Sequence, residues 1–475
     1  MSEQVTRRTF LETSGKTAAG MAALSASLGG CAANGPKISV AAASQRRKIG
    51  ANEKFNIALI GCGGMGRYNL QDFMKSGQVN VVAVCDVDDQ RMKDAAWKVQ
   101  EIQGEAAAKK VKQVKDYRWV IDNKDIDCVI VATPDHWHAI PMMNAVAAGK
   151  DVYCEKPCCH NIKEGRAMVE AAKKYNAIVQ VGTQQRSAAH MQAARDFVRS
   201  GKLGTISMTE SYTYGNEAPD GMGHDPDAPV PAGVDYETWL GPAPKRPFNK
   251  RRFHLTWRWY FEYAAGMVGD WNVHLQDIIM WTMKTPYPKA VSTSGGKLIL
   301  TDDRTTPDTM LATYEFGSGP YTPNGHVHIY TMRKASGPPW NRKGYGMVFH
   351  GTNGKLHLTR DGWEVIGDAK DWSKPEAGLR VPTAQYEGHR EHDTHIKNFL
   401  DCVRTRKAPI AAIDEHFKSV AACHLANVSL RAGRKLFWDH RKELCYKNAE
   451  LTIPDPKAND LLTRKYRKGY ELPNL

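Results

Sequence analysis

The chain has 475 residues, of which 42% are hydrophobic and 24% charged. This composition is typical of globular proteins and excludes disordered or collagen-like chains, and the length suits two to three domains. Lys and Arg outnumber Asp and Glu by 65 to 51, a net charge of +14. Because the basic residues are spread along the chain, apart from short clusters such as 464–468, we expect a solvated surface and no nucleic-acid partner. After the N-terminal segment no apolar run approaches the roughly 20 residues that span a bilayer, which excludes a polytopic membrane protein.

The first 31 residues are typical of an export signal. Thr6–Leu11 contains a twin-arginine pattern, and a weakly apolar stretch follows. Residues 1–31 are therefore predicted to direct export of the folded protein to the periplasm or cell envelope. The alternative is an amphipathic helix with two incidental arginines. Residues 32–53 are predicted to be a linker.

Leu28–Cys31 resembles a bacterial lipobox. A lipid on Cys31 would be the only membrane attachment, and ordinary cleavage near Val40–Ala43 remains the alternative. The chain has 10 cysteines, an unusual number of thiols for an exported protein unless it folds before export. The sequence contains no CxxC and no Cys/His spacing typical of zinc, so we expect no metal site.

A strand, a glycine-rich turn and a helix follow one another in residues 55–75. Phe55–Ile60 is short, apolar and followed by glycine, which predicts a buried strand, and Arg67–Lys75 is predicted to be helical. The GxGxxG turn between them lets a dinucleotide pyrophosphate approach the helix N-terminus. The predicted cofactor contacts in this turn are Gly61, Gly63, Gly64, Met65 and Gly66.

The next predicted strand, Val79–Asp86, ends in an acidic residue. A carboxylate at this position accepts hydrogen bonds from the ribose hydroxyls and repels a 2′-phosphate, so Asp86 favours NAD over NADP. The alternative is that Asp86 caps the following helix.

Predicted strands and helices continue to alternate up to Val181. The further strands are 127–132, 151–154 and 177–181, and the helices between them are 141–148 and 162–175. This alternation predicts an α/β fold with a doubly wound parallel sheet in residues 54–181. Ligands bind at the carboxyl ends of such strands. Further candidate residues at these ends are Thr133, Pro134, His138, Glu155 and Lys156.

From about Gly182 the pattern changes to that of an α+β domain with an open mixed sheet, predicted over residues 182–440. Its predicted strands are 206–214, 290–295, 309–316, 326–332, 346–350 and 355–359, and its helices are 188–199, 392–405 and 417–433. The polar segment Asn216–Lys250 is rich in Pro and Gly and is interpreted as a lid or an oligomer arm. Residues 441–475 are predicted to be a C-terminal tail.

Four motifs in this order resemble the Gfo/Idh/MocA family of sugar and polyol oxidoreductases over roughly residues 54–440. They are Gly61–Gly66, Thr133–His138, Glu155-Lys156-Pro157 and Asp270–Asp277. The resemblance implies an N-terminal Rossmann domain, a second domain with an open mixed sheet, and a homo-oligomer. It further implies that Lys156, Asp270 and His274 form the catalytic site.

The spacing of Asp270, His274 and Asp277 places all three residues on one face of a helix. The imidazole of His274 has a pKa suited to accept the proton of a hydroxyl group that loses a hydride, and Lys156 can stabilise the developing negative charge. A capped helix in which Asp satisfies a buried His is the alternative.

Predicted substrate contacts lie beside the last parallel strand, before the Asp270 helix and on it. They are Gln185, Arg186, Trp257, Arg258, Tyr260 and Asp277. Aromatic faces interspersed with charged groups suit a sugar, although such aromatic runs are also common in cores. His136 and His138 form an H-x-H pair that lacks a third ligand nearby, which argues against a metal site. The resemblance implies that the pair belongs to a loop beside the cofactor.

These observations predict an exported, NAD-dependent oxidoreductase that moves a hydride between a secondary hydroxyl of a sugar or glycoside and nicotinamide. Free NAD is scarce outside the cytoplasm, so the cofactor is expected to stay tightly bound. One alternative is a redox-neutral, NAD-dependent glycoside hydrolase that acts through a transient keto-sugar and elimination. Another is a protein that binds nucleotide or sugar without chemistry.

Overall fold

The computed structural model describes residues 46–337, 343–389 and 391–475. These residues form two sheets with their helices within one structural unit, Ile38–Leu475. The predicted export signal, Cys31 and the first part of the predicted linker lie outside the described residues. Among the helices of the described chain, none has the length and apolar character needed to cross a membrane.

The first sheet is parallel, with six strands in the order β3-β2-β1-β4-β5-β6. The strands are β1 (Phe55–Ile60), β2 (Val79–Cys85), β3 (Lys112–Val114), β4 (Cys128–Val131), β5 (Asp151–Cys154) and β6 (Val179–Val181). The predicted Rossmann sheet is therefore confirmed. The sequence does not predict β3, because this short edge strand is polar and its residues are exposed or half-buried. The strand order reverses between β1 and β4, where sheets of this kind bind ligands.

Helices cover both faces of this sheet. They are α2 (Gly64–Lys75), α3 (Asp89–Gln103), α4 (Glu105–Ala108), α5 (Tyr117–Asp122), α6 (Ala139–Ala147), α7 (Ile162–Lys174) and α11 (His392–Thr405). Ile57 and Leu59 of β1 share a buried cluster with residues of α2, α3 and α11, whereas Ala58 and Ile60 share one with α6 and α7. Since alternate residues of a strand face opposite sides, burial of both sides explains the apolar run of β1.

The second sheet is mixed, with ten strands in the order β14-β13-β12-β11-β7-β10-β9-β8-β15-β16. The strands are β7 (Ile206–Tyr214), β8 (Ala290–Gly296), β9 (Thr309–Phe316), β10 (His326–Arg333), β11 (Tyr345–Gly351), β12 (Gly354–Thr359), β13 (Gly362–Gly367), β14 (Ala384–Glu387), β15 (Leu436–Asp439) and β16 (Leu444–Tyr446). β7 and β10 are parallel and their other neighbours are antiparallel. The six strands predicted in this domain are confirmed within one residue at each end, and β13 to β16 are additional.

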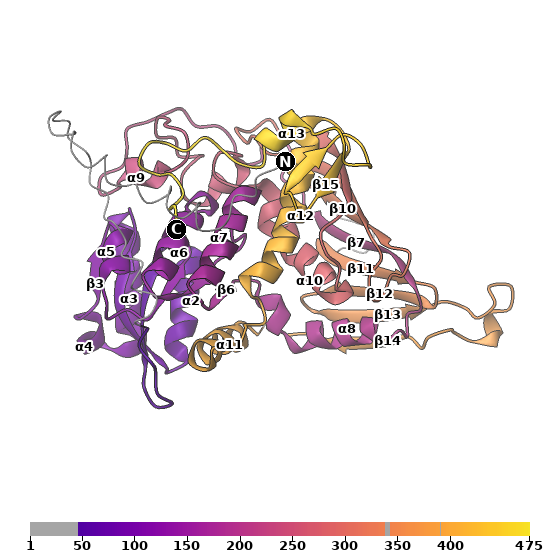
Figure 1. The fold of residues 1–475 in the computed structure, drawn as a ribbon, viewed down its shortest axis with the longest axis horizontal. Helices are drawn as coiled ribbons and strands as arrows, with labels where there is room; N and C mark the ends of the chain where they lie inside the picture. Colours follow the sequence, from indigo (N-terminus) through magenta and orange to yellow (C-terminus); the bar gives the residue numbers. More distant parts are fainter. Residues whose placement is uncertain (1–45, 338–342, 390) are drawn as a thin grey trace, which may run out of the picture. The chain divides into compact units, whose positions relative to one another are not determined.

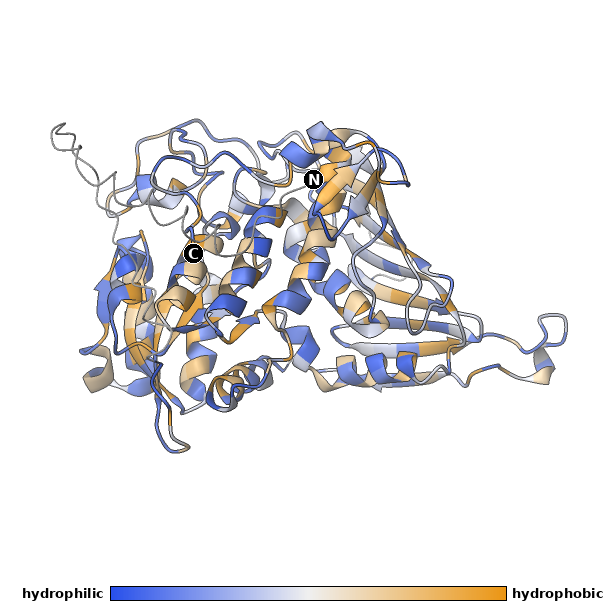
Figure 2. Cartoon of the chain, viewed as in Figure 1, coloured by the Kyte–Doolittle hydropathy of each residue, from blue (hydrophilic) through white to orange (hydrophobic). Residues whose placement is uncertain are grey.

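The remaining helices all follow the last strand of the first sheet in the chain. They are α8 (Ala189–Arg199), α9 (Tyr236–Leu240), α10 (Val273–Met283), α12 (Ile413–Ala432) and α13 (Pro456–Asp460). α12 is buried along most of its length and contacts α7, α10 and β8, so it joins the two domains (Figure 1). Figure 2 shows hydrophobic residues on the strands of both sheets and hydrophilic residues over much of α7 and α8.

The segment predicted as a C-terminal tail is folded and packed, which corrects that prediction. β16 pairs with β15, and the Asp455 carboxylate accepts the N–H of Ala458 (3.1 Å) at the start of α13. Leu462 is 1% exposed. The basic run 464–468 has the composition of a solvated tail, but Arg464 forms an ion pair with the buried Glu164 of α7 (2.7 Å).

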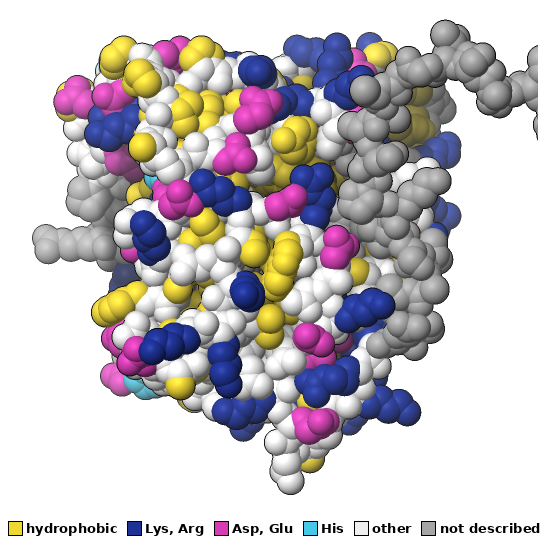
Figure 3. Space-filling model, turned by 90° about the vertical axis from the view of Figure 1, so that its left-hand side faces the viewer, with side chains coloured by type: hydrophobic (Ala, Val, Ile, Leu, Met, Phe, Trp, Pro, Cys, Tyr) yellow, Lys and Arg dark blue, Asp and Glu magenta, His cyan; other side chains and the backbone are white. Residues whose placement is uncertain are grey.

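On the side of the molecule formed by the first domain, the charged side chains are spread over the surface, as the sequence predicts. On the face drawn in Figure 3, Lys and Arg side chains lie among Asp, Glu and apolar side chains rather than in one basic patch.

Candidate active site

A cavity opens at the carboxyl ends of the first sheet and is closed on its other side by the second domain. The cavity is lined by twelve of the predicted site residues: Gly61, Gly63, Gly64, Met65, Asp86, Thr133, Pro134, Glu155, Lys156, Trp257, Arg258 and Asp270. The predicted residues outside this lining are Gly66, His138, His274, Gln185, Arg186, Tyr260 and Asp277.

The glycine turn has a backbone geometry that other residues do not adopt easily. Gly61 has φ of +95°, and a Cβ built on it would lie 2.6 Å from the backbone of Ala132 and Thr133. A Cβ on Gly66 would lie 1.9 Å from the carbonyl oxygen of Gly61. Gly66 therefore allows close packing, while a Cβ on Gly64 at the start of α2 would meet open space. The free N–H groups of this helix end suit a phosphate.

Asp86 lies at the end of the cavity where a ribose is expected. Its carboxylate accepts the backbone N–H groups of Cys62 (2.6 Å) and Asp88 (3.0 Å). Burial raises the pKa of Asp86, and these two N–H groups oppose the rise. Asp86 precedes α3, but it is Asp88 that caps this helix by accepting the N–H of Gln90 (2.9 Å). The capping alternative for Asp86 is thus wrong.

Lys156 and Asp270 form the contact that joins the first domain to the second at the cavity. The Lys156 ammonium, just after β5, donates to the carbonyl oxygen (2.7 Å) and to the carboxylate (2.9 Å) of Asp270. The Arg258 guanidinium also donates to this carboxylate (3.2 Å). Burial raises the pKa of Asp270, but the two cations outweigh it and hold the pKa below its usual value. Asp270 is therefore a carboxylate.

Asp270 and His274 are close in sequence but belong to different helical turns. Asp270 lies in the π-helical turn η5 (Val268–Asn272), and His274 lies at the start of α10. The predicted single α-helix over these residues is therefore a π turn followed by an α-helix, and the shared face stays a prediction. π turns of this kind are frequent at functional sites.

His274 is 5% exposed, and its Nδ1 has no hydrogen-bond partner within the described part of the chain. Burial and the positive charges of Lys156 and Arg360 lower the pKa of His274 well below 6.5. The imidazole is therefore neutral near pH 7 and can accept a proton. The alternative in which Asp270 satisfies His274 is not the arrangement seen, since Asp270 is bound by Lys156 and Arg258.

Arg186 and Asp277, predicted as substrate contacts, bind each other instead of lining the cavity. Their side chains are 2% and 0% exposed and form two hydrogen bonds of 2.7 Å. His416 of α12 lies 3.4 Å from the Asp277 carboxylate. Burial raises the pKa of Asp277, but Arg186 and His416 hold it far below its usual value. This buried ion cluster connects α10 and α12 behind His274.

Three other predicted site residues outside the cavity lining contact other parts of the protein. Both ring nitrogens of His138 bond to main-chain oxygens, of Pro157 (2.7 Å) and Thr133 (2.8 Å). The Gln185 amide faces the Arg360 guanidinium at 3.1 Å. Tyr260 belongs to the apolar cluster around α9. A substrate contact by Gln185 or Tyr260 stays a prediction.

Several cavity residues are not identified from the sequence. They are chiefly Arg91, Lys115, Tyr117, Asp135, Trp137, Thr238, Trp239, His254 and Leu255. Asp135 is buried beside Lys156 and Arg258, and burial raises its pKa well above its usual value. The sequence feature that could have identified Asp135 as a cavity residue is its position within the motif Thr133–His138.

The segment Asn216–Lys250 supplies Thr238 and Trp239 to the cavity wall, and its role as a lid stays a prediction. The Trp137 indole N–H donates to the carbonyl oxygens of Thr238 and Trp239, both at 3.0 Å. His136 bonds through Nε2 to the same Trp239 oxygen (2.9 Å). Trp137, Thr238 and Trp239 all line the cavity, so these bonds close its wall. The role of this segment as an oligomer arm stays a prediction.

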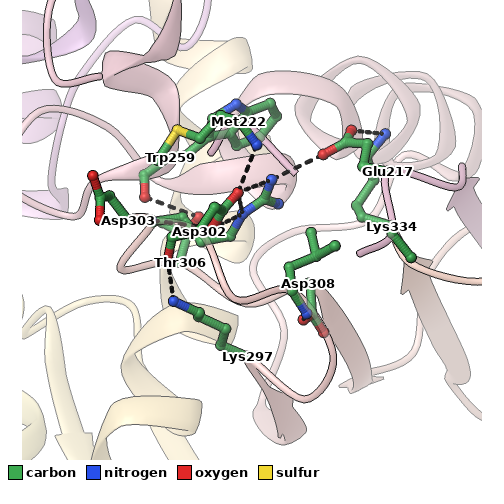
Figure 4. A network of polar contacts seen from close by, with 12 residues as sticks. Glu217, Met222, Trp259, Lys297, Asp302, Asp303, Thr306, Asp308 and Lys334 are labelled. Atoms are coloured by element: carbon green, nitrogen blue, oxygen red, sulfur yellow. Dashed lines mark hydrogen bonds and ion pairs between the residues drawn. The ribbon is translucent and has the colours of Figure 1, made fainter. Parts of the chain in front are cut away.

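A second polar network fixes the segment that carries Arg258 (Figure 4). The carbonyl oxygen of Trp259 accepts the N–H groups of Thr305 (2.9 Å) and Thr306 (3.2 Å). Arg304 lies over the Trp259 ring, 5.4 Å from its centroid, and pairs with the buried Asp302 (2.8 Å). Because Arg258 precedes Trp259, this network positions the guanidinium that reaches Asp270.

Residues 55–183 match a protein family described as the Gfo/Idh/MocA oxidoreductase family with an NAD-binding Rossmann fold. Residues 189–294 match the C-terminal alpha/beta domain of the same family. The two domains belong to the Gfo/Idh/MocA family of oxidoreductases.

Similar proteins include enzymes of two kinds. A levoglucosan dehydrogenase of Pseudarthrobacter phenanthrenivorans is 36% identical over 91 residues, 19% of this chain and 23% of the relative. A glycosyl hydrolase family 109 protein of Shewanella pealeana is 26% identical over 171 residues, 36% of this chain and 38% of the relative. The chain thus spans well under half the length of these relatives. A solved WlbA dehydrogenase of Chromobacterium violaceum, in complex with NADH and UDP-GlcNAcA, has a TM-score of 0.60 at 19% identity and covers 83% of this chain and 99% of its own.

We predict that Asp277→Asn destabilises the fold, because it leaves the buried Arg186 guanidinium without its counter-charge. Breaking a buried pair of this kind costs about 3–5 kcal/mol of unfolding free energy. Chemical denaturation measures the loss. Glu105→Gln, which removes the exposed pair with Lys109, is the control and should change the free energy by less than about 1 kcal/mol. Equal effects of the two variants would contradict the structural role of Asp277.

Proposed function

We propose that the protein is an NAD-dependent oxidoreductase that moves a hydride between a secondary hydroxyl of a sugar or glycoside and nicotinamide. The carrying observation is the position of Lys156, paired with Asp270 at 2.9 Å and lining the same cavity as the glycine turn. The family of the two domains supports the redox chemistry, and the levoglucosan dehydrogenase and the WlbA dehydrogenase support a carbohydrate substrate.

The cavity fits a dinucleotide. The glycine turn leaves open space at Gly64, the N-terminus of α2 provides N–H groups for the pyrophosphate, and Asp86 provides a carboxylate for the ribose. Asp86 is also the reason to propose NAD rather than NADP, although Arg91 and Lys115 line the same cavity. A bound nicotinamide would supply the hydride acceptor.

The chain's own residues supply the proton chemistry. The neutral imidazole of His274 accepts the proton of the substrate hydroxyl as its carbon loses a hydride. The Lys156 ammonium donates a hydrogen bond to the same oxygen and stabilises its negative charge. Asp270 holds the ammonium through two contacts and binds a neighbouring hydroxyl with its remaining acceptor capacity.

We further propose that the protein is exported by the twin-arginine route to the periplasm or cell envelope, with a lipid on Cys31 as its membrane anchor. We also propose that the protein forms homo-oligomers and that it keeps its NAD tightly bound. The support is the pattern Thr6–Leu11 and the family of the two domains.

A second candidate function is redox-neutral glycoside hydrolysis, favoured by the glycosyl hydrolase family 109 relative. In that reaction the substrate would lose a hydride to give a transient ketone, which acidifies the adjacent C–H so that its proton and the aglycone leave by elimination. Addition of water and return of the hydride would complete the hydrolysis. Incubation with aryl glycosides separates the two functions. Release of the aglycone with no change in absorbance at 340 nm would support hydrolysis, and NADH formation with no release would support dehydrogenation.

We predict that Lys156→Ala and His274→Ala each lower kcat/KM for the sugar by at least about 100-fold, the usual contribution of a general acid or base. NADH formation at 340 nm measures the rate. Lys173→Ala, on the exposed side of α7, is the matched control and should retain the wild-type rate. Wild-type kinetics in both site variants would overturn the assignment.

We predict that the acidic limb of the kcat/KM profile lies well below pH 6.5, the usual pKa of a histidine. Since the pKa of His274 is lowered, the imidazole stays neutral as the pH falls through 6.5 and takes up a proton only at lower pH. Steady-state rates from pH 5 to 9 measure this limb. A rate that already falls with a midpoint near 6.5 would show an unshifted histidine and contradict the described site.

A further inference from the structure

The C-terminal residues cross the outer side of the cavity wall. After α13 the chain runs toward α6 and α9, as the yellow segment in Figure 1 shows. Leu462 anchors the start of this segment, because it is 1% exposed and its carbonyl oxygen accepts the N–H of Lys163 (3.0 Å). Arg464 and Tyr466 both bond to Glu164 of α7, at 2.7 and 3.0 Å. We call residues 461–470 the C-terminal strap.

The strap contacts the residues directly behind the cavity lining. The Arg464 guanidinium donates to the carbonyl oxygen of His136 (2.7 Å). The Tyr470 ring packs edge-on against Trp137, with centroids 5.6 Å apart. Arg467 forms an ion pair with Glu237 of α9. His136 and Glu237 adjoin Trp137 and Thr238, which line the cavity.

The part of the cavity wall around α9 depends on contacts with the strap, because it contains little regular secondary structure of its own. α9 has five residues, and its flanking loops from Gly215 to Phe253 contain no other helix or strand among the described elements. Short irregular segments of this kind open at low free-energy cost unless other contacts hold them. The strap connects this segment to the buried Glu164 of the first domain.

We propose that the C-terminal strap is a positioning segment of the dinucleotide site, which holds the wall closed and retains the dinucleotide through turnover. This proposal rests on the proposed function, since it takes a nicotinamide dinucleotide as the occupant of the cavity. It assigns the strap no contact with the reacting atoms. Its effect is on the rate of cofactor release.

The test compares two double variants of the full-length protein that remove the same charge from the strap. Arg464→Ala/Arg467→Ala removes the contacts to His136, Glu164 and Glu237, whereas Lys465→Ala/Lys468→Ala removes two exposed side chains. Each protein is loaded with labelled NAD and then mixed with excess unlabelled NAD, and the dissociation rate of the labelled NAD is measured. Near-UV circular dichroism checks the fold.

The proposal predicts at least about tenfold faster NAD release from the arginine variant and an unchanged rate from the lysine variant, with the change in affinity lying mainly in the off-rate. In a single turnover of the NAD-loaded protein, the rate of hydride transfer should stay within about twofold, because the strap does not touch the reacting atoms. Equal release rates from the two variants would overturn the proposal. If the arginine variant is misfolded, Tyr470→Ala, which removes the ring contacts to Trp137 and Arg467, decides by the same measurement. Absence of NAD binding by the wild-type protein would instead overturn the proposed function.

Discussion

The ion pair between Lys156 and Asp270 is the contact on which the site depends. Lys156 follows a strand of the first sheet, and Asp270 lies in a π-helical turn of the second domain, 114 residues later. Both side chains are partly buried, and Arg258 adds a second cation that offsets the cost of placing the Asp270 carboxylate there. The pairing therefore joins, at the cavity, the domain of the glycine turn to the domain that carries His274.

The surroundings of Asp270 and His274 set the protonation states of these two groups. Two cations keep Asp270 ionised, and burial with neighbouring positive charge keeps His274 neutral. A carboxylate, an ammonium and a neutral imidazole are the three states that removal of a hydroxyl proton requires. Behind them, the buried pair of Arg186 and Asp277 holds α10 in place. A cavity whose wall is held by the C-terminal strap would suit a compartment without a free pool of dinucleotide.

Local patterns made much of this structure predictable. The strand before Gly61, the glycine spacing and the acid at Asp86 identify a dinucleotide-binding domain because each follows from contacts within about 30 residues of chain. The motif residues Lys156 and Asp270 were also predicted to meet. The sequence could not show that Arg186 pairs with Asp277, since a polar residue after a strand suits a substrate contact as well as a buried ion pair. The basic composition of the strap predicts a solvated tail, because the sequence does not indicate that Arg464 binds the buried Glu164. Trp137 and Thr238 come together at the cavity through tertiary contacts, which local sequence patterns do not predict.

The central claim is that Lys156 and Asp270 act as one unit in the reaction. A double-mutant cycle on kcat/KM with Lys156→Met and Asp270→Asn tests it most directly, because residues that act together give non-additive losses. If the two residues act as one unit, kcat/KM of the double variant should be scarcely lower than that of the slower single variant. Losses that add in free energy would show that the two residues act independently and would contradict the account.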